Sequence, residues 1–215
     1  HAATEPKGRR RESGLMRIYL ASRSPRRREL LTQIGVQFDT VIFRDGNRAD
    51  PETDETPLPG EAVEAYVERV ALAKAEHGAR ILGWRRLVPR PVLSADTTLE
   101  LDGEIIGKPL TEAHAISILK RLSGRTHRVL TGVAVQADGR TDYALSISEV
   151  RFRELSEAEI RQYVLSGEAM DKAGAYGIQG RAGLFVEHLS GSFSGVMGLP
   201  LCETGLLLKR CGGVF

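Results

Sequence analysis

A basic turn near the start of the chain is the first candidate for chemistry. Residues 22–28 read SRSPRRR and stand between an apolar run at 18–21 and a stretch with helical apolar periodicity at 26–34 that Gly35 ends. Ser24 suits a helix N-cap and Pro25 the first helical position, so the arginines fall beside unpaired backbone N–H groups. Such a turn favours phosphate binding. The alternative is a solvated basic run or targeting signal, which fits a single copy between strand and helix less well.

An aspartate and a lysine flank a predicted hairpin further along. Asp96 ends the apolar strand 92–95, and Lys108 follows the hairpin in which 97–101 pairs with 104–106. A carboxylate at a strand end, facing a lysine at the hairpin's exit, suits a cleft where the acid orients water and the lysine neutralises phosphate charge. Taken alone, Asp96 fits a turn-capping role at least as well.

Two further charged residues accompany a predicted helix at 61–77. Lys74 falls on the apolar stripe of this helix, and Glu55 lies in the long polar loop 44–60 that precedes it, next to Asp54. A lysine on an apolar stripe can serve a site or can extend its ammonium to water over the core. By default a glutamate in a loop faces solvent, so its role depends on what the fold places opposite it.

Several other chemistries have no support in the sequence. There is no GxGxxG, Walker A or GxSxG pattern, and no HxH or HxxxH spacing. His114 and His127 are expected to be a helix-surface residue and a strand-edge hydrogen-bonding residue rather than metal ligands. Cys202 and Cys211 have no neighbouring histidine, so a thiol nucleophile is not expected.

The elements that must position these residues alternate between helices and hairpins. A helix at 112–122 is capped by Thr111, a long antiparallel ribbon pairs 129–135 with 143–152, and Ser156 with Glu159 forms a capping box for a helix that ends at 165. Seven glycines within 171–200 indicate backbone packed against a ligand or neighbouring elements, and a helix at 201–210 follows. The pattern predicts an α/β fold with a mixed twisted sheet, flanking helices and two lobes around a cleft.

Length and composition agree with one such domain over 16–215. The chain has 215 residues, of which 41% are hydrophobic and 27% charged, and no apolar run approaches the roughly 18 residues that cross a bilayer. Residues 1–15 are polar and basic and are expected to be a disordered extension or a segment added to the natural chain. The remainder is formally neutral, which gives little support for a nucleic-acid partner. Two cysteines without a CxxC spacing or a signal peptide favour the cytoplasm.

In combination, the motifs resemble the Maf family of nucleoside triphosphate pyrophosphatases from Met16 to about Lys209. The matching segments are LASRSPRR at 20–27, Asp54-Glu55, Arg69 with Ala71 and Lys74-Ala75, Ala95-Asp96-Thr97, Gly107-Lys108-Pro109, Ser123-Gly124 to His127, Thr131-Gly132-Val133, and DKAGAYGIQG at 171–180. The sequence departs from the family pattern at three places: Arg23 replaces a commoner glycine, Val70 replaces leucine, and residues 44–53 are an insertion. Because the insertion shifts the register, Glu55 is assigned by counting back from Tyr66 and Lys74.

This resemblance implies a fold similar to inosine triphosphate pyrophosphatase, a homodimer, and hydrolysis of a nucleoside triphosphate to the monophosphate and pyrophosphate with a divalent cation, Mg²⁺ or Mn²⁺. It implies that Asp96 is the proton acceptor and that Glu55, with Asp96, is an acidic ligand for metal or water. The residues expected to hold phosphates are Ser22, Arg27, Lys74 and Lys108.

The three positions that govern base choice in this family read Arg26, Thr97 and Gln179 here and resemble the branch that acts on dTTP and UTP. Gln179 can offer a pyrimidine both a donor and an acceptor, whereas an ionised glutamate only accepts. The other branch, with tryptophan, glutamine and glutamate at these positions, suits 7-methyl-GTP. That nucleotide, another non-canonical one, and a non-enzymatic nucleotide-binding regulator of septum formation are the alternatives.

Overall fold

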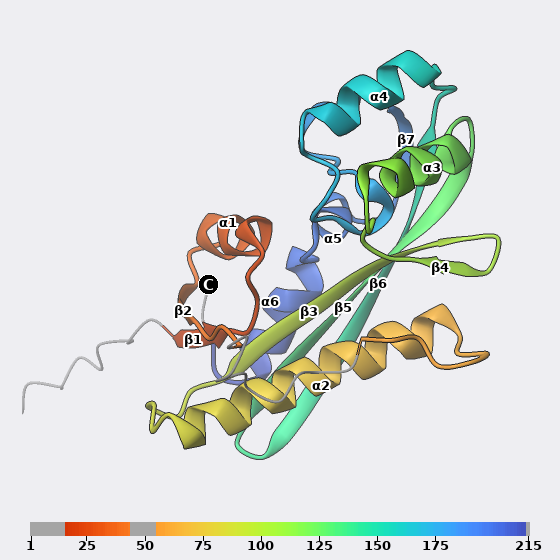
Figure 1. Ribbon diagram of the computed structural model, residues 1–215. Helices are drawn as coiled ribbons and strands as arrows, with labels where there is room; N and C mark the ends of the chain where they lie inside the picture. Colours follow the sequence, from red (N-terminus) through yellow and green to blue (C-terminus); the bar gives the residue numbers. More distant parts are fainter. Residues whose placement is uncertain (1–15, 44–54, 214–215) are drawn as a thin grey trace, which may run out of the picture.

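A seven-stranded mixed sheet organises the protein (Figure 1). The computed structural model describes residues 16–43 and 55–213, so the expected extension 1–15, Asp54 and the proposed insertion 44–53 lie outside the described residues. The strands follow the order β2-β1-β3-β5-β6-β7, and β4 pairs with β3. β1 is parallel to β2 and β3, and the other pairs are antiparallel, which confirms the predicted fold class. The strands are β1 (Arg17–Leu20), β2 (Gln37–Thr40), β3 (Val92–Leu101), β4 (Glu104–Ile106), β5 (Thr126–Ala137), β6 (Arg140–Phe152) and β7 (Val186–Ser190).

The predicted strand end at Asp96 is wrong. β3 runs without a break from Val92 to Leu101, and its ladder with β5 is continuous, so Asp96 lies in mid-strand opposite Gly132. What changes near Asp96 is the neighbour on the other edge of β3. β1 pairs with β3 only as far as Leu93, and β4 begins pairing at Leu99. The sequence pattern thus marks a change of strand partner rather than a turn.

The helices begin largely where their capping residues predict. Ser24 caps α1 (Pro25–Gln33), Thr111 caps α3 (Glu112–Leu122), and the capping box at Ser156 opens α4 (Glu157–Leu165). α6 (Leu201–Arg210) also has its predicted bounds. α2 (Val63–Trp84) extends well past the predicted end at residue 77, because its buried face continues through Gly78, Ile81 and Leu82. The glycine-rich stretch contains short 3₁₀ turns at 173–175 and 181–184, β7 and the short α5 (Phe193–Met197).

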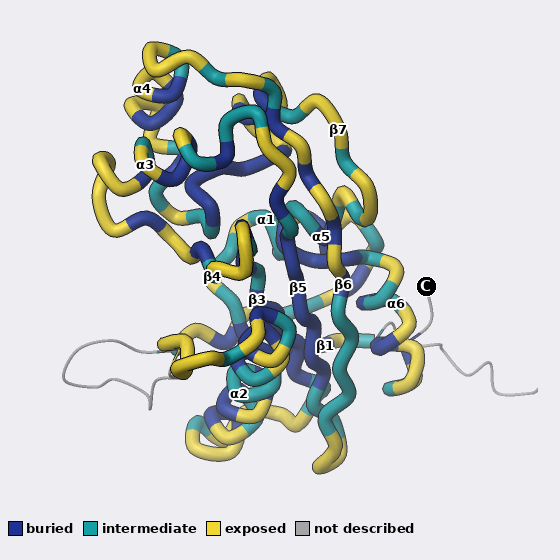
Figure 2. The backbone as a smooth tube through the Cα atoms, turned by 90° about the vertical axis from the view of Figure 1, so that its right-hand side faces the viewer, coloured by how far each residue is buried: buried dark blue, intermediate teal, exposed yellow. Residues whose placement is uncertain are grey.

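The two faces of the sheet carry different helices. Along β5, Leu130 and Ala134 pack beneath α2, whereas the alternate residues Val133 and Val135 join a core that includes residues of α1 and α6. α2 therefore covers one face, and α1 with α6 the other (Figure 1). β5 is buried over most of its length, as Figure 2 shows. This alternation fixes which side of the sheet each polar residue of β3 and β5 can reach.

Two hydrophobic clusters lie at the two ends of the long strands. Leu93 and Val133 belong to the cluster with α1 and α6, while Leu99 and Val129 belong to the cluster with α3 and α4. Between these clusters β3 carries Asp96, Thr97 and Thr98, and β5 carries Thr131 and Gly132. Among the described residues, no helix is both long enough and apolar enough to cross a membrane.

Gly174 is a position where the turn requires glycine. Its φ is +72°, its N–H donates to the Gly107 carbonyl at 3.1 Å, and a Cβ there would overlap the buried side chain of Leu99.

Gly35 has a similar φ of +75° but nothing within 4 Å of its Cβ position. Gly35→Ala is therefore expected to cost about 1 kcal/mol of unfolding free energy, from backbone strain alone. Gly174→Ala is expected to cost about 1–3 kcal/mol more from overpacking. Urea unfolding of both variants measures the difference, and equal losses would contradict the predicted overlap.

Candidate active site

A gap in the row of strands creates the candidate site. Between Leu93, where β1 stops pairing, and Leu99, where β4 starts, one edge of β3 has no strand partner among the described residues. A cleft of about 1380 Å³ opens there, next to the carboxyl end of β1 and the N-terminus of α1. Asp96 and Thr97 are successive residues of β3 and point to opposite faces of the sheet, yet both line this cleft through the open edge.

A lysine between two carboxylates occupies the α2 side of the cleft. Lys74 Nζ lies 2.6 Å from Glu55 Oε1 and 3.2 Å from Asp96 Oδ1. The side chains of Lys74 and Asp96 are only 18% and 12% exposed, whereas that of Glu55 is 52% exposed. The structure thus brings together three of the predicted site residues from a loop, a helix and a strand. Lys74 does not extend to open water over the core.

Glu55 is held in this place by the first turns of α2. Tyr66, on the apolar stripe of the helix, donates its hydroxyl to the Glu55 carbonyl at 2.8 Å. Arg69 binds Glu61 through two hydrogen bonds and also donates to the Thr56 carbonyl at 3.0 Å. These contacts anchor the segment before the helix. The sequence placed Tyr66 on the buried stripe but gave no signal that its hydroxyl would hold this loop.

Burial and charge act in opposite directions on the two carboxyls. Burial raises the pKa of Asp96 and outweighs the lowering by Lys74 and Arg27, while Glu55 adds to the rise. For Glu55 burial also acts upward, but Lys74, Lys108 and Arg27 together leave its pKa below the ordinary value. The site therefore separates its two acids into a more basic, buried Asp96 and a more acidic Glu55.

The turn before α1 forms the second wall. The Ser24 hydroxyl accepts from the backbone N–H of Arg27, as expected of an N-cap, and the Ser22 hydroxyl accepts from the backbone N–H of Ser24 at 3.1 Å. The guanidinium of Arg27 donates to Ser22 Oγ at 3.2 Å and lies against β3, and burial lowers the pKa of Arg27 to about 10. Arg23 is exposed at the rim and donates to the Phe43 carbonyl.

The glycine-rich segment supplies the third wall. Arg26 Nη1 lies 3.6 Å from Asp171 Oδ2, so an ion pair crosses the cleft between α1 and this segment. Gln179 is exposed on the cleft, and Lys108 lines the same opening. Lys172 binds Asp171 at 2.9 Å and the Glu168 carbonyl at 2.6 Å. Sequence reasoning assigned no role to Asp171 or Lys172, and their only signal was a charged pair within the glycine-rich motif.

Two buried groups behind this wall explain how it is held. His127 Nε2 lies 2.6 Å from the Tyr176 hydroxyl, and burial lowers the pKa of His127 to about 4. The Tyr163 hydroxyl accepts from the Gly177 N–H at 3.2 Å. His127 is thus a hydrogen-bonding residue, as predicted, although it is buried rather than at a strand edge. His114 is exposed on α3, where its Nδ1 accepts from the Leu110 N–H, as expected of a helix-surface residue.

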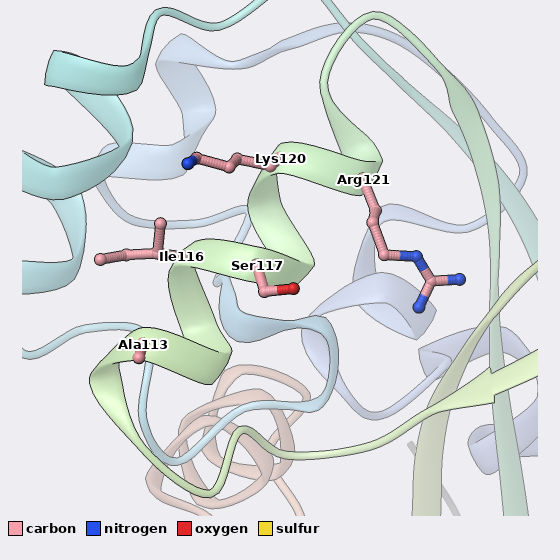
Figure 3. A pocket seen from close by; sticks show the side chains of 5 residues that line it. All are labelled: Ala113, Ile116, Ser117, Lys120 and Arg121. Carbon is pink, nitrogen blue, oxygen red and sulfur yellow. The ribbon is translucent and has the colours of Figure 1, made fainter.

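A second, shallow hollow on α3 lacks these features (Figure 3). Its two basic side chains point apart in Figure 3 and are each paired, Lys120 with Glu157 at 2.8 Å and Arg121 with Glu104 at 2.6 Å. Such exposed pairs leave no concentrated charge for an anion. The lining residues are Ala113, Ile116, Ser117, Lys120 and Arg121.

One atom of the site fits a cation. Asp96 Oδ2 is buried and accepts no hydrogen bond from any described residue, while its other oxygen faces Lys74. A buried carboxylate oxygen without a partner is costly unless a ligand binds it. The described residues contain no group of three or more His, Cys, Asp or Glu suited to a metal. Two carboxylates completed by water and phosphate oxygens are nevertheless the usual Mg²⁺ arrangement.

A mixed sheet whose open edge gathers carboxylates, lysines and arginines defines an α/β protein with a cleft lined by charged side chains of both signs. A family model described as "Maf-like protein" matches residues 17–211, and the chain belongs to this family. The resemblance seen in the motifs is thereby confirmed.

Two curated relatives carry the same name. The chain is 74% identical over 197 residues to "dTTP/UTP pyrophosphatase" of Dechloromonas aromatica (strain RCB), covering 92% of this chain and 98% of the relative. It is 64% identical over 197 residues to the protein of that name from Aromatoleum aromaticum, covering 91% and 96%. Among solved structures, the Staphylococcus aureus Ham1 protein aligns at a TM-score of 0.43 and 18% identity, over 63% of this chain and 71% of that one.

Proposed function

We propose that this protein hydrolyses dTTP and UTP to the nucleoside monophosphate and pyrophosphate by attack of water on the α-phosphorus. The observation that carries this proposal is the buried Asp96, paired with Lys74 and flanked by Glu55, at the floor of a cleft with a basic wall. The curated relatives named above support the choice of nucleotides.

The basic side chains bind the triphosphate. Arg27, Lys74 and Lys108 reach the cleft from three different elements, and the Ser22 hydroxyl lies beside Arg27. In the reaction the water oxygen bonds to the α-phosphorus, the bond to the bridging oxygen breaks, and its electron pair leaves with pyrophosphate. Fixed positive groups in a partly dehydrated cleft stabilise the charge that grows on this leaving group.

Asp96 accepts the proton of the attacking water. An aspartate with an ordinary pKa near 3.9 is a weak base at neutral pH. Burial raises the pKa of Asp96, which strengthens it as a base, while Lys74 beside it favours the ionised form. Glu55, whose pKa is lowered, stays ionised and serves as a ligand rather than a base.

Asp96 and Glu55 would hold a divalent cation, Mg²⁺ or Mn²⁺, through the unpartnered Asp96 Oδ2 and the half-exposed Glu55 carboxylate. When bound, the cation neutralises phosphate charge and acidifies water. Lys74 then keeps the two carboxylates oriented while the substrate's own phosphates complete the binding site.

Three residues that line the cleft would select the base: Arg26, Thr97 and Gln179. Gln179 is exposed and engages no other described side chain by hydrogen bonding, so its amide can offer both a donor and an acceptor. Gln179→Glu is expected to lower kcat/KM for dTTP about tenfold or more, because an ionised glutamate lacks the donor and adds negative charge. Gln179→Met, which removes both groups without charge, is the matched control. Unchanged dTTP kinetics in Gln179→Glu would exclude Gln179 from base recognition.

Pyrophosphate release with Mg²⁺ or Mn²⁺ across dTTP, UTP, CTP, 7-methyl-GTP and ITP tests the proposal. Preference for dTTP and UTP supports both the reaction and the base assignment. Preference for 7-methyl-GTP or ITP keeps the reaction and overturns the three-residue assignment. Release of orthophosphate indicates a phosphatase, and no release by folded protein favours a nucleotide-binding regulator.

The same proposal includes a homodimer, which the resemblance implies, and a cytoplasmic location, which the cysteines favour. It also includes no nucleic-acid partner and no membrane partner. Cys202 and Cys211 are both free thiols, which suits a reducing compartment. Sedimentation equilibrium of the purified chain would test the dimer, and a monomer at micromolar concentration would contradict it.

A further inference from the structure

A chain of hydrogen bonds, partly buried at Arg27 and fully buried at its inner end, connects the second wall of the cleft to the sheet. Arg27 Nη2 donates to Thr97 Oγ1 at 3.2 Å, the hydroxyls of Thr97 and Thr131 lie 2.9 Å apart, and Thr131 Oγ1 donates to the Gly195 carbonyl at 2.7 Å. Thr97 and Thr131 are directly opposite on β3 and β5, between the two hydrophobic clusters. Thr131 is fully buried.

The chemistry of its two ends gives this chain a single direction. A carbonyl oxygen can only accept, so the hydroxyl hydrogen of Thr131 is committed to Gly195. Thr131 must then accept from Thr97, which uses the hydroxyl hydrogen of Thr97. A guanidinium can only donate, so Thr97 presents a lone pair to Arg27. Removing the hydroxyl of Thr131 would leave the hydrogen of Thr97 without this acceptor, so the lone pair that Thr97 presents to Arg27 would no longer be fixed in direction.

The same chain determines what Arg27 can offer a ligand. Besides Thr97, its Nε donates to the Gly198 carbonyl at 2.8 Å and its Nη1 to Ser22 Oγ at 3.2 Å. A guanidinium has five N–H donors, so two remain, one on each terminal nitrogen. Two donors on one rigid plane match the oxygens of a phosphate group. Held on three sides, Arg27 meets a phosphate without first losing side-chain freedom.

We propose that Thr131 is a positioning residue for phosphate binding, acting through Thr97 to hold Arg27. The inference rests on the proposed function, in which Arg27 binds phosphate. It also means that the Thr97 hydroxyl can accept from a nucleotide but cannot donate to one, because its hydrogen is already used. Thr97 then influences the site chiefly through Arg27.

The test compares Thr131→Val, which keeps the shape and removes the hydroxyl, with Thr131→Ser, which restores it. Two quantities are measured for each folded variant: KM and kcat for dTTP, and the dissociation constant of inorganic pyrophosphate by calorimetry. Thr131→Val is expected to raise both KM and the pyrophosphate dissociation constant about tenfold, the usual effect of one hydrogen bond to a charged group, with kcat within about twofold of wild type. Thr131→Ser should restore both constants.

Ser94→Ala is the matched control. Ser94 is also fully buried in β3 and donates its hydroxyl to a backbone carbonyl, that of Ala71 at 2.7 Å, but it belongs to no contact of Arg27. Ser94→Ala should lose about as much unfolding free energy as Thr131→Val does, and it should keep the wild-type KM for dTTP. Adding Thr131→Val to Thr97→Val should raise KM no further, because both changes interrupt one chain.

Wild-type KM and pyrophosphate affinity in Thr131→Val would overturn the proposal, as would failure of Thr131→Ser to restore them or an equal loss in Ser94→Ala. The calorimetric measurement separates this outcome from failure of the proposed function. If the wild type releases no pyrophosphate but binds it, a tenfold loss in Thr131→Val still supports the role of Thr131. If the wild type does not bind pyrophosphate at all, both inferences fall.

Discussion

In the Asp96→Asn variant, pyrophosphate release from dTTP is expected to fall by about 10²–10⁴-fold, the usual contribution of a general base. Asparagine keeps the size of the side chain and cannot accept a proton at the reacting water. It also replaces the unpartnered buried Oδ2 of Asp96, the atom best suited to a cation. The measurement is kcat under saturating dTTP and Mg²⁺. Retained turnover would remove Asp96 as the base.

The stability of the same variant provides its control. Because burial raises the pKa of Asp96 in the folded state, the folded protein binds this proton more tightly than the unfolded chain does. The ionised carboxylate therefore lowers stability above its folded pKa, and this cost disappears below the ordinary value of 3.8. Asp96→Asn should be at least as stable as wild type in urea unfolding at pH 7, and any gain should shrink as the pH falls. Loss of fold at pH 7 would make the kinetic result uninformative about the base and would contradict the predicted sign.

The Lys74→Met variant is expected to lose about 10²–10³-fold in kcat/KM, comparable to removing one fixed donor that stabilises transition-state charge. Methionine keeps much of the apolar stem of Lys74 within the α2 stripe but leaves Glu55 and Asp96 without the ammonium between them. The pKa of Asp96 should then rise further, because Lys74 is a group that lowers it. The acidic limb of the pH–rate profile should consequently move to higher pH.

Lys120→Met is the matched control for Lys74→Met. Lys120 also forms a short ion pair, at 2.8 Å with Glu157, but both partners are exposed on the surface away from the cleft. Exposed pairs contribute little, so activity and the pH profile should remain those of wild type. If Lys74→Met lowers kcat/KM without moving the acidic limb, Lys74 binds phosphate but does not tune Asp96. If neither changes, the role assigned to Lys74 is wrong.

Local patterns in the sequence were sufficient for most elements. Capping residues such as Ser24, Thr111 and Ser156 depend on neighbours within one turn, and the structure confirms the helix starts that they predict. The predicted end of α2 at residue 77 was wrong. The helix continues because Gly78, Ile81 and Leu82 extend its buried face, and their burial depends on packing against the sheet. β7 and α5 were not predicted, because glycine-rich segments follow tertiary contacts rather than local propensity.

The sequence by itself determined which residue types this protein brings to its chemistry and, through its motifs, its family. It identified Asp96, Lys74, Glu55, Lys108 and the turn before α1 as candidates, although it placed Asp96 at a strand end. Only the tertiary structure decided that β1 and β4 leave an open edge on β3, through which residues from both faces of the sheet meet in one cleft. Only it decided that Lys74 lies between two carboxylates and that Thr131 and Thr97 hold Arg27. The physical reason is that periodicity and capping act over a few residues, whereas the pKa of a buried acid and the direction of a hydroxyl depend on groups that are distant in the chain and adjacent only after folding.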